Sequence, residues 1–116
     1  MSPNRVILEN DLAYAIRDGF PVTPLHSLVI PKRHAATYFD LTSFELLACD
    51  QLLRSLRDQI LIEDAIVQGF NIGLNAGAAA GQTIFHCHFH LIPRRVGDVD
   101  DPRGGVRHAI PGKGYY

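Results

Sequence analysis

The stretch GQTIFHCHFHLIP, residues 81–93, carries three histidines at alternate positions. Apolar residues separate them, and successive side chains of a strand point to opposite faces, so residues 84–93 predict a strand with one apolar face against a core. The other face then presents His86, His88 and His90. Packing gains nothing from three imidazoles on an exposed face, which favours a chemical role over three separately solvated histidines.

The segments around this strand predict an α+β domain. Residues 6–17 predict two short strands about a turn, residues 27–31 a buried strand, and residues 70–74 a further strand. Residues 31–40 predict a loop with one helical turn. Together with the histidine strand, these segments predict a largely antiparallel five-stranded sheet.

One long helix is the clearest element. Thr42 is followed three residues later by Glu45, which is the spacing of a capping box, and Ser43 is a second candidate cap. Five apolar residues then recur at three- and four-residue spacing and form one stripe: Leu46, Cys49, Leu53, Leu56 and Ile60. The pattern predicts a helix over about 43–63 that packs against the sheet.

The overall composition predicts one soluble domain. The chain has 116 residues, 47% of them apolar, and a net charge of −1, which offers no long-range attraction to nucleic acid or to an anionic membrane. No segment approaches the roughly 20 apolar residues of a membrane span, and the N-terminal residues do not form a signal peptide. Cys49 and Cys87 are expected to be buried and reduced, which indicates a cytoplasmic protein. We expect a catalytic domain over residues 1–95 and a tail over 96–116 that packs on it.

Two kinds of chemistry fit the histidines. A His-x-His strand is a good zinc chelate, but the Cα atoms of His86 and His90 would lie roughly 13 Å apart, too far for all three rings to bind one ion. Two rings could bind a metal together with His26 or Asp18. In the other chemistry, a neutral imidazole attacks phosphorus or carbon. The small-residue loop at 76–83 favours it, because glycines let backbone N–H groups approach phosphate oxygens.

Residues 81–92 resemble the signature of the histidine-triad superfamily, in which three histidines alternate with apolar residues and two apolar residues follow. A second stretch, HSLVIPKRH at residues 26–34, is similar to another hallmark of that superfamily. The resemblance covers roughly residues 6–95 and implies the fold of that superfamily. Two features depart from the pattern: Leu25 stands where a glycine is common, and residues 78–80 are alanines where polar residues are frequent.

The resemblance implies a role for each histidine. The middle one, His88, would be the nucleophile and would form a nucleotidyl-histidine intermediate that water hydrolyses. His86 would form a hydrogen-bonded pair with His26, and His90 would contact the phosphate and assist the leaving group. The resemblance assigns the binding of phosphate to residues upstream of the triad: Asn75, Gly81, Gln82 and Thr83.

A nucleoside site is implied as well. Asp18 corresponds to a position that holds the ribose hydroxyls, and a carboxylate can accept hydrogen bonds from both. Leu8 and Ile16 would line an apolar pocket for the base, although ordinary core packing explains these two residues equally well. No residue is assigned to a metal.

The resulting expectation is an enzyme that cleaves the α-phosphate bond of an adenine nucleotide conjugate. The conjugate would be a dinucleoside polyphosphate, such as diadenosine tetraphosphate, or a nucleoside phosphoramidate, and a nucleotidyltransferase is the related activity. No redox or organic cofactor is required, although a divalent cation could accompany a polyphosphate. The resemblance also implies a homodimer. A metal-dependent enzyme and a nucleotide-binding regulatory module remain as alternatives.

Overall fold

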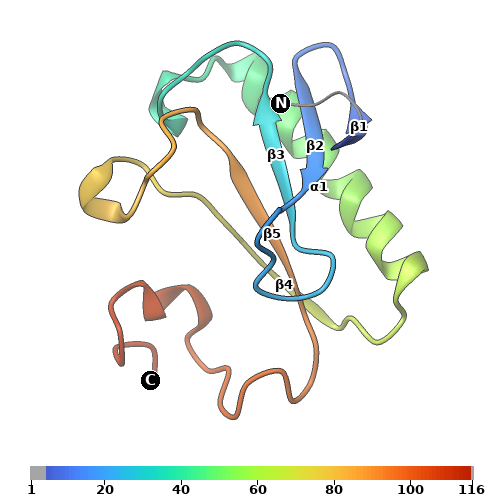
Figure 1. Cartoon of the computed structure of the whole chain (residues 1–116), viewed down its shortest axis with the longest axis vertical. Coiled ribbons are helices and arrows are strands. Elements are labelled where there is room, and N and C mark those ends of the chain that lie inside the picture. Colours follow the sequence, from blue (N-terminus) through green and yellow to red (C-terminus); the bar gives the residue numbers. More distant parts are fainter. Residues whose placement is uncertain (1–4, 116) are drawn as a thin grey trace.

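The computed structural model describes residues 5–115, in which an antiparallel sheet is covered on one face by a long helix (Figure 1). The strands of these residues are β1 (Val6–Glu9), β2 (Ala13–Arg17), β3 (Ser27–Pro31), β4 (Gly69–Gly73) and β5 (Phe89–Arg94), and the helix is α1 (Ser43–Glu63). The strands pair in the order β1-β2-β3-β5-β4, with every pair antiparallel. Short 3-10 turns form at η2 (Tyr38–Asp40), η3 (Ala78–Ala80) and η4 (Gly105–Ala109). The predicted α+β fold, with its long helix and its helical turn within residues 31–40, is confirmed.

Helix α1 begins where the sequence predicts. Thr42 Oγ1 accepts a hydrogen bond from Glu45 N at 3.1 Å, and Glu45 Oε1 accepts one from Thr42 N at 2.8 Å. Arg33 donates two further hydrogen bonds to the same carboxylate, at 2.9 and 2.8 Å, and these bonds lower the pKa of Glu45 to about 2. The buried carboxylate therefore ties the loop that follows β3 to the first turn of α1.

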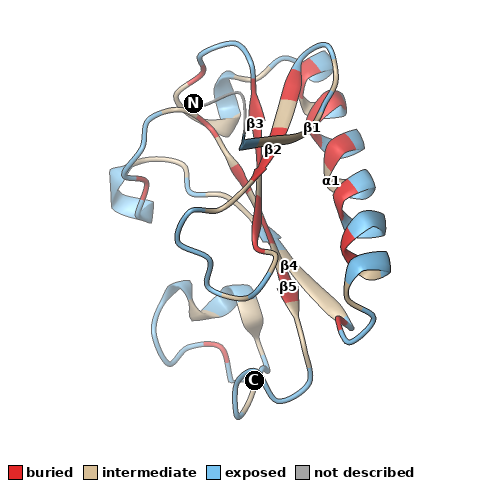
Figure 2. Ribbon diagram, turned by 45° about the vertical axis from the view of Figure 1, so that its right-hand side comes forward, coloured by how far each residue is buried: buried red, intermediate tan, exposed pale blue. Residues whose placement is uncertain are grey.

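The core lies between α1 and one face of the sheet (Figure 2). Five apolar side chains of the helix are buried there: Ala48, Cys49, Leu52, Leu56 and Ile60. Leu46 and Leu53 of the predicted stripe pack at its margin and are partly buried. The thiols of Cys49 and Cys87 are free and buried, and burial raises their pKa to about 12 and about 11, so both stay protonated.

Strand β5 begins at Phe89, so the prediction of a strand over residues 84–93 is wrong in its first half. Cys87 N donates at 2.7 Å to Ala35 O in the loop after β3, and this bond diverts the stretch from the sheet. The physical reason is that β3 ends at Pro31, because a proline has no N–H with which to extend a ladder. The first two histidines of the triad therefore precede β5, and only the third lies within it.

The sheet face opposite α1 carries the histidines. Ile16 pairs with Leu28, and Leu28 pairs with His90, so these three side chains share one face. Two residues away along β2 and β3, Tyr14 pairs with Ile30 and points to the same face. This face is the floor of the candidate site.

The tail turns back after β5 and brings η4 into contact with β4. At its start, Arg94 donates to Asn71 Oδ1 at 2.6 Å and holds both carboxylate oxygens of Asp98 at 2.8 and 2.9 Å. The tail is thus attached to the edge of the sheet away from β1. Within residues 5–115, α1 and the shorter helices lack the combination of length and apolar character that a bilayer crossing requires.

Candidate active site

Four histidines gather at the start of β5 on the open face of the sheet. The ring centroids of His88 and His90 are 5.2 Å apart, and those of His26 and His90 are 5.1 Å apart. His86 and His88 line one apolar pocket, and the ring of His86 lies 5.2 Å from the ring of His34. The structure therefore brings together the four residues predicted to be catalytic.

The pairing within this group differs from the prediction. His26 Nε2 lies 2.9 Å from His90 Nδ1, so His26 pairs with the third histidine of the triad and not with His86. His86 Nε2 instead donates to Pro31 O at 2.8 Å. The register explains the difference: Ser27 pairs with Leu91, which places His26 beside His90 and several residues away from His86.

Backbone contacts determine which nitrogens of His26 and His90 carry protons. Val22 N–H donates to His26 Nδ1 at 3.2 Å, and an N–H group can only donate, so His26 carries its proton on Nε2. This Nε2–H donates to His90 Nδ1, and neutral His90 therefore keeps its proton on Nε2. Burial lowers the pKa of both imidazoles, and the negative charge of Asp18 partly opposes that effect. The pair is accordingly neutral above its lowered pKa.

His88 is oriented by a backbone carbonyl two residues before it, just ahead of β5. Its Nδ1 lies 2.8 Å from His86 O, and a carbonyl oxygen can only accept, so Nδ1 carries the proton. The lone pair of Nε2 then points away from the backbone, on a side chain that is only partly buried. This is the tautomer that a nucleophilic imidazole needs.

The Gln82 side chain is buried and forms hydrogen bonds with three backbone groups. It is 4% exposed; its amide oxygen accepts from Gly77 N at 2.8 Å, and its amide nitrogen donates to Ala36 O at 2.6 Å and Ile84 O at 3.1 Å. Contact of this amide with phosphate stays a prediction, and it would require Gln82 to give up one of these backbone bonds. Through the bond to Ala36 O, Gln82 attaches the loop at residues 76–83 to the segment after β3.

The remaining residues predicted to bind phosphate lie at the surface of this loop. Asn75, Gly81 and Thr83 are exposed. Gly81 has a φ of 95°, a conformation that favours glycine, and its N–H donates to Ala78 O within the loop at 3.0 Å. The side chains of Asn75 and Thr83 are therefore the better candidates for phosphate contacts.

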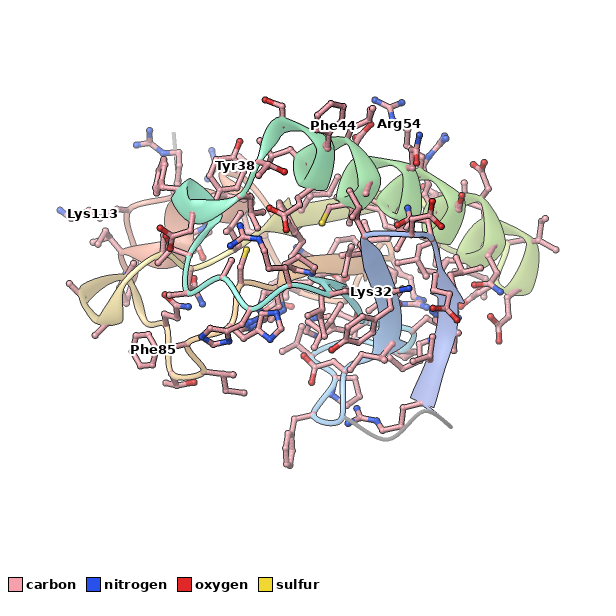
Figure 3. The ribbon with its side chains drawn as sticks, turned by 90° about the horizontal axis from the view of Figure 1, so that it is seen from above. Lys32, Tyr38, Phe44, Arg54, Phe85 and Lys113 are labelled. Atoms are coloured by element: carbon pink, nitrogen blue, oxygen red, sulfur yellow. The ribbon has the colours of Figure 1, made fainter. Side chains whose placement is uncertain are left out.

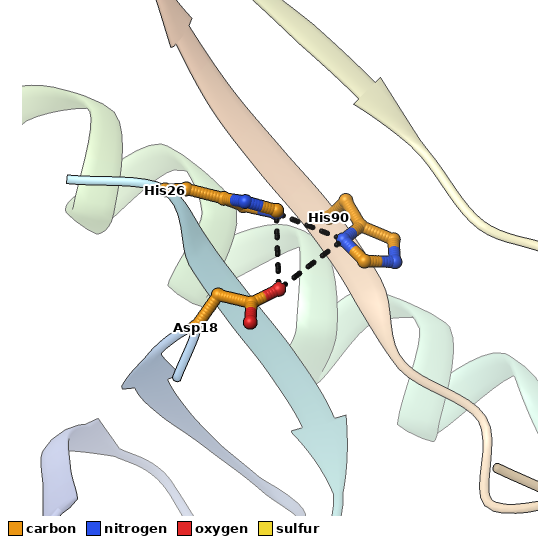
Figure 4. A group of neighbouring side chains, drawn as sticks. All are labelled: Asp18, His26 and His90. Carbon is orange, nitrogen blue, oxygen red and sulfur yellow. Dashed lines mark hydrogen bonds and ion pairs between the residues drawn. The ribbon is translucent and has the colours of Figure 1, made fainter. Parts of the chain in front are cut away.

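Asp18 faces the paired histidines. Its Oδ2 is 3.4 Å from His26 Nε2 and 4.0 Å from His90 Nδ1, and Oδ1 accepts from Phe20 N at 2.8 Å (Figure 4). The side chain is 16% exposed, so one edge of the carboxylate still reaches solvent. Its position at the site was predicted, and its contact with two imidazoles was not.

The predicted base pocket does not form from Leu8 and Ile16. Leu8 packs against the core on the α1 side of the sheet, and Ile16, although it lies on the open face, is 1% exposed. An apolar pocket of about 110 Å³ lies elsewhere on that face and is lined by Tyr14, Leu28, Ile30, Ile84, His86 and His88. Sequence reasoning missed its apolar residues, although the alternation within residues 13–17 and 27–31 places three of them opposite the core.

A metal ion was the main alternative ligand for these histidines. Potential ligand atoms of Asp18, His26 and His90 all lie within 4.8 Å of one another. The donor set does not fit a metal, however, because the bond from Val22 leaves a proton on His26 Nε2, where the ligating lone pair would have to be. Hydrogen bonding accounts for this cluster as it stands.

Known proteins match this chain in sequence and in fold. The HIT domain family model matches residues 1–97. An uncharacterized HIT-like protein of Synechococcus elongatus is 34% identical over 93 residues, which cover 80% of this chain and 81% of that protein. The adenylylsulfatase HINT3 of Arabidopsis thaliana is 39% identical over 103 residues, covering 84% of this chain and 49% of HINT3. The crystal structure of Plasmodium falciparum diadenosine triphosphate hydrolase with cyclomarin A matches with a TM-score of 0.75 at 27% identity, covering 87% of this chain and 68% of that one.

Proposed function

Because this chain belongs to the HIT domain family, we propose that it hydrolyses the α-phosphate bond of an adenine nucleotide conjugate through a covalent intermediate on His88. The observation that carries the proposal is the hydrogen bond from His88 Nδ1 to His86 O, which leaves Nε2 as an available nucleophile. The ring of His90, which pairs with His26, lies 5.2 Å from the ring of His88 between centroids.

The reaction has two displacements at phosphorus. In the first, the Nε2 lone pair of His88 forms a bond to the α-phosphorus while the bond to the leaving group breaks and that group takes a proton from His90. In the second, water attacks phosphorus, the bond to His88 breaks, and the proton lost by water returns to His90. The products are the nucleoside monophosphate and the free leaving group, and both histidines regain their starting forms.

The surroundings of His88 favour an uncharged leaving group. Among residues 5–115, no lysine or arginine lines the apolar pocket at His86 and His88, and residues 78–80 of the loop before the triad are alanines. A polyphosphate leaving group needs cationic partners, whereas an amine needs a proton donor and apolar surface. We therefore place a nucleoside phosphoramidate ahead of a dinucleoside polyphosphate. The names of HINT3 and of the Plasmodium hydrolase are consistent with adenine nucleotide chemistry.

Single-turnover mixing of the protein with an AMP phosphoramidate tests this proposal. Intact-protein mass spectrometry should show a transient adenylyl adduct on the wild type, and His88→Ala should form none and lose turnover by at least roughly a thousandfold. His108→Ala, in the tail, is the matched control and should behave as the wild type. Binding of AMP by His88→Ala should persist, because other residues make the ground-state contacts.

Three outcomes would contradict the proposal. If His88→Ala kept more than about a tenth of the wild-type rate, His88 would not be the nucleophile, because the covalent route needs its imidazole. Activity that a strong chelator abolishes and only zinc restores would indicate a metal-dependent enzyme. Tight AMP binding without turnover of any conjugate would indicate a regulatory module.

A further inference from the structure

The carboxylate of Asp18 lies against two imidazoles at once (Figure 4). Both His26 Nε2 and His90 Nδ1 approach the same oxygen, Oδ2, at 3.4 and 4.0 Å, while Oδ1 is held by Phe20 N. His26 is 3% exposed and cannot turn away without losing its bond from Val22. Asp18 is therefore placed to respond to the protonation state of the pair.

The hydrogen bond within the pair is compatible only with neutral His90. His26 Nε2–H donates to His90 Nδ1 at 2.9 Å, which requires a lone pair on that nitrogen. A protonated His90 carries hydrogens on both nitrogens, so two N–H groups would then point at each other. His26 cannot relieve the conflict by moving its proton to Nδ1, because Val22 N–H already points there. Protonation of His90 therefore needs a second acceptor.

Asp18 Oδ2 is that acceptor. It lies within 4.0 Å of His90 Nδ1, so a shift of roughly 1 Å would give a charge-assisted hydrogen bond of ordinary length. The charged and titratable groups that face His90 are His88 on its own segment, His26 before β3 and Asp18 after β2. Burial and the two imidazoles lower the pKa of His90, and only Asp18 raises it.

We propose that Asp18 is a positioning residue that allows His90 to carry the proton delivered to the leaving group, an inference that rests on the hydrolytic function proposed above. In the reactive state, both His26 Nε2–H and His90 Nδ1–H donate to Asp18 Oδ2. His90 gives its Nε2 proton to the departing nitrogen or oxygen and remains neutral with Nδ1–H on Asp18. The water that attacks the intermediate returns a proton to His90 Nε2, so charge and protons balance over the cycle.

Histidine titration by NMR tests this role without any substrate. Asp18→Asn keeps an oxygen that can accept from Phe20 N and removes the negative charge, so the midpoint of His90 should fall by roughly one pH unit. Asp18→Glu keeps the charge and should retain most of the wild-type midpoint. Asp58→Asn, an exposed carboxylate on α1, is the matched control and should change nothing. An unchanged His90 midpoint in a folded Asp18→Asn protein would overturn the proposal.

Kinetics with two leaving groups separates this role from ribose binding. Asp18→Asn should slow hydrolysis of an AMP phosphoramidate, whose amine must be protonated, by at least roughly tenfold. The loss for the 4-nitrophenyl ester of AMP, whose phenolate leaves without a proton, should be at least about fivefold smaller, because any loss of ribose contacts would affect both substrates alike. In the phosphoramidate reaction, the basic limb of the kcat profile should move to lower pH, because the pKa of His90 falls.

Each contrary result has a distinct meaning. Equal losses for both leaving groups, confined to substrates with ribose hydroxyls, would show that Asp18 binds ribose and would overturn the proposal. Failure of the wild type to hydrolyse either compound would reject the proposed function, and the NMR titration would still decide whether Asp18 controls the charge of His90.

Discussion

Three backbone groups determine which ring nitrogen carries the proton in three of the active-site histidines. Val22 N–H acts on His26, Pro31 O on His86 and His86 O on His88. The residue types at the site could be predicted from the spacing of the histidines in the sequence. Their tautomers could not, because each depends on a backbone atom whose position follows from the completed fold. The predicted pair of His26 with His86 was wrong for the same reason, since His26 pairs with His90.

At Leu25, the departure of the sequence from the glycine common in the superfamily coincides with an unusual backbone conformation. It has a φ of 70°, the single positive φ among the non-glycine residues that the structure describes. A glycine is common at this position in the superfamily that the sequence resembles, and glycine adopts this conformation without strain. The departure noted in the sequence therefore marks a backbone that turns sharply into His26, with Leu25 packed on the core at that turn.

At the residue scale, Gln82→Ala should destabilise the protein. The substitution leaves Gly77 N–H and two carbonyl groups without the partner that the buried Gln82 side chain supplies, which should cost about 1–3 kcal/mol of the free energy of unfolding. Urea denaturation measures this loss, and Gln51→Ala on the exposed side of α1 is the matched control. Unchanged stability together with a raised KM would instead show that Gln82 contacts the substrate.

Among the secondary-structure elements, prediction succeeded where local chemistry sets the boundary. The capping box at Thr42 and the periodicity of the apolar stripe predicted α1 with the observed bounds. β5 was predicted to begin five residues too early, at residue 84 instead of Phe89, because alternation alone cannot show that Cys87 bonds to the loop after β3. A contact across many residues of sequence overrode the local pattern.

The cap of α1 provides a prediction at this scale. Thr42→Ala removes the side-chain acceptor for Glu45 N and should lower the free energy of unfolding by about 1 kcal/mol. Ser43→Ala, at the first helical residue, should have a much smaller effect, because Thr42 already caps the helix. Thermal or urea denaturation of the two variants compares them directly, and equal losses would contradict the assignment of the cap.

For the whole molecule, the edge strand β4 raises the question of what covers it. In the described residues β4 is the last strand of the sheet and pairs on one side with β5. Next to it, a groove of about 370 Å³ lies between α1 and the sheet and is lined by Asp50, Leu53, Arg54, Arg57, Phe70, Ile72 and Leu91. Ile72 is 54% exposed there, so an apolar side chain of the edge strand faces solvent beside the groove.

The homodimer inferred from the sequence would use this surface. β4 and α1 of a second copy would pack against this surface and bury the apolar part of the groove. Light scattering at micromolar concentration should then give about twice the chain mass of 12.8 kDa for the wild type. Ile72→Lys places a charge in the groove and should shift the protein towards the monomer, because an edge lysine opposes strand pairing. Ile66→Lys introduces the same charge at a residue that is 68% exposed outside the groove and should leave the dimer intact. A wild-type mass near 12.8 kDa, or equal effects of the two lysines, would refute a dimer formed through this surface.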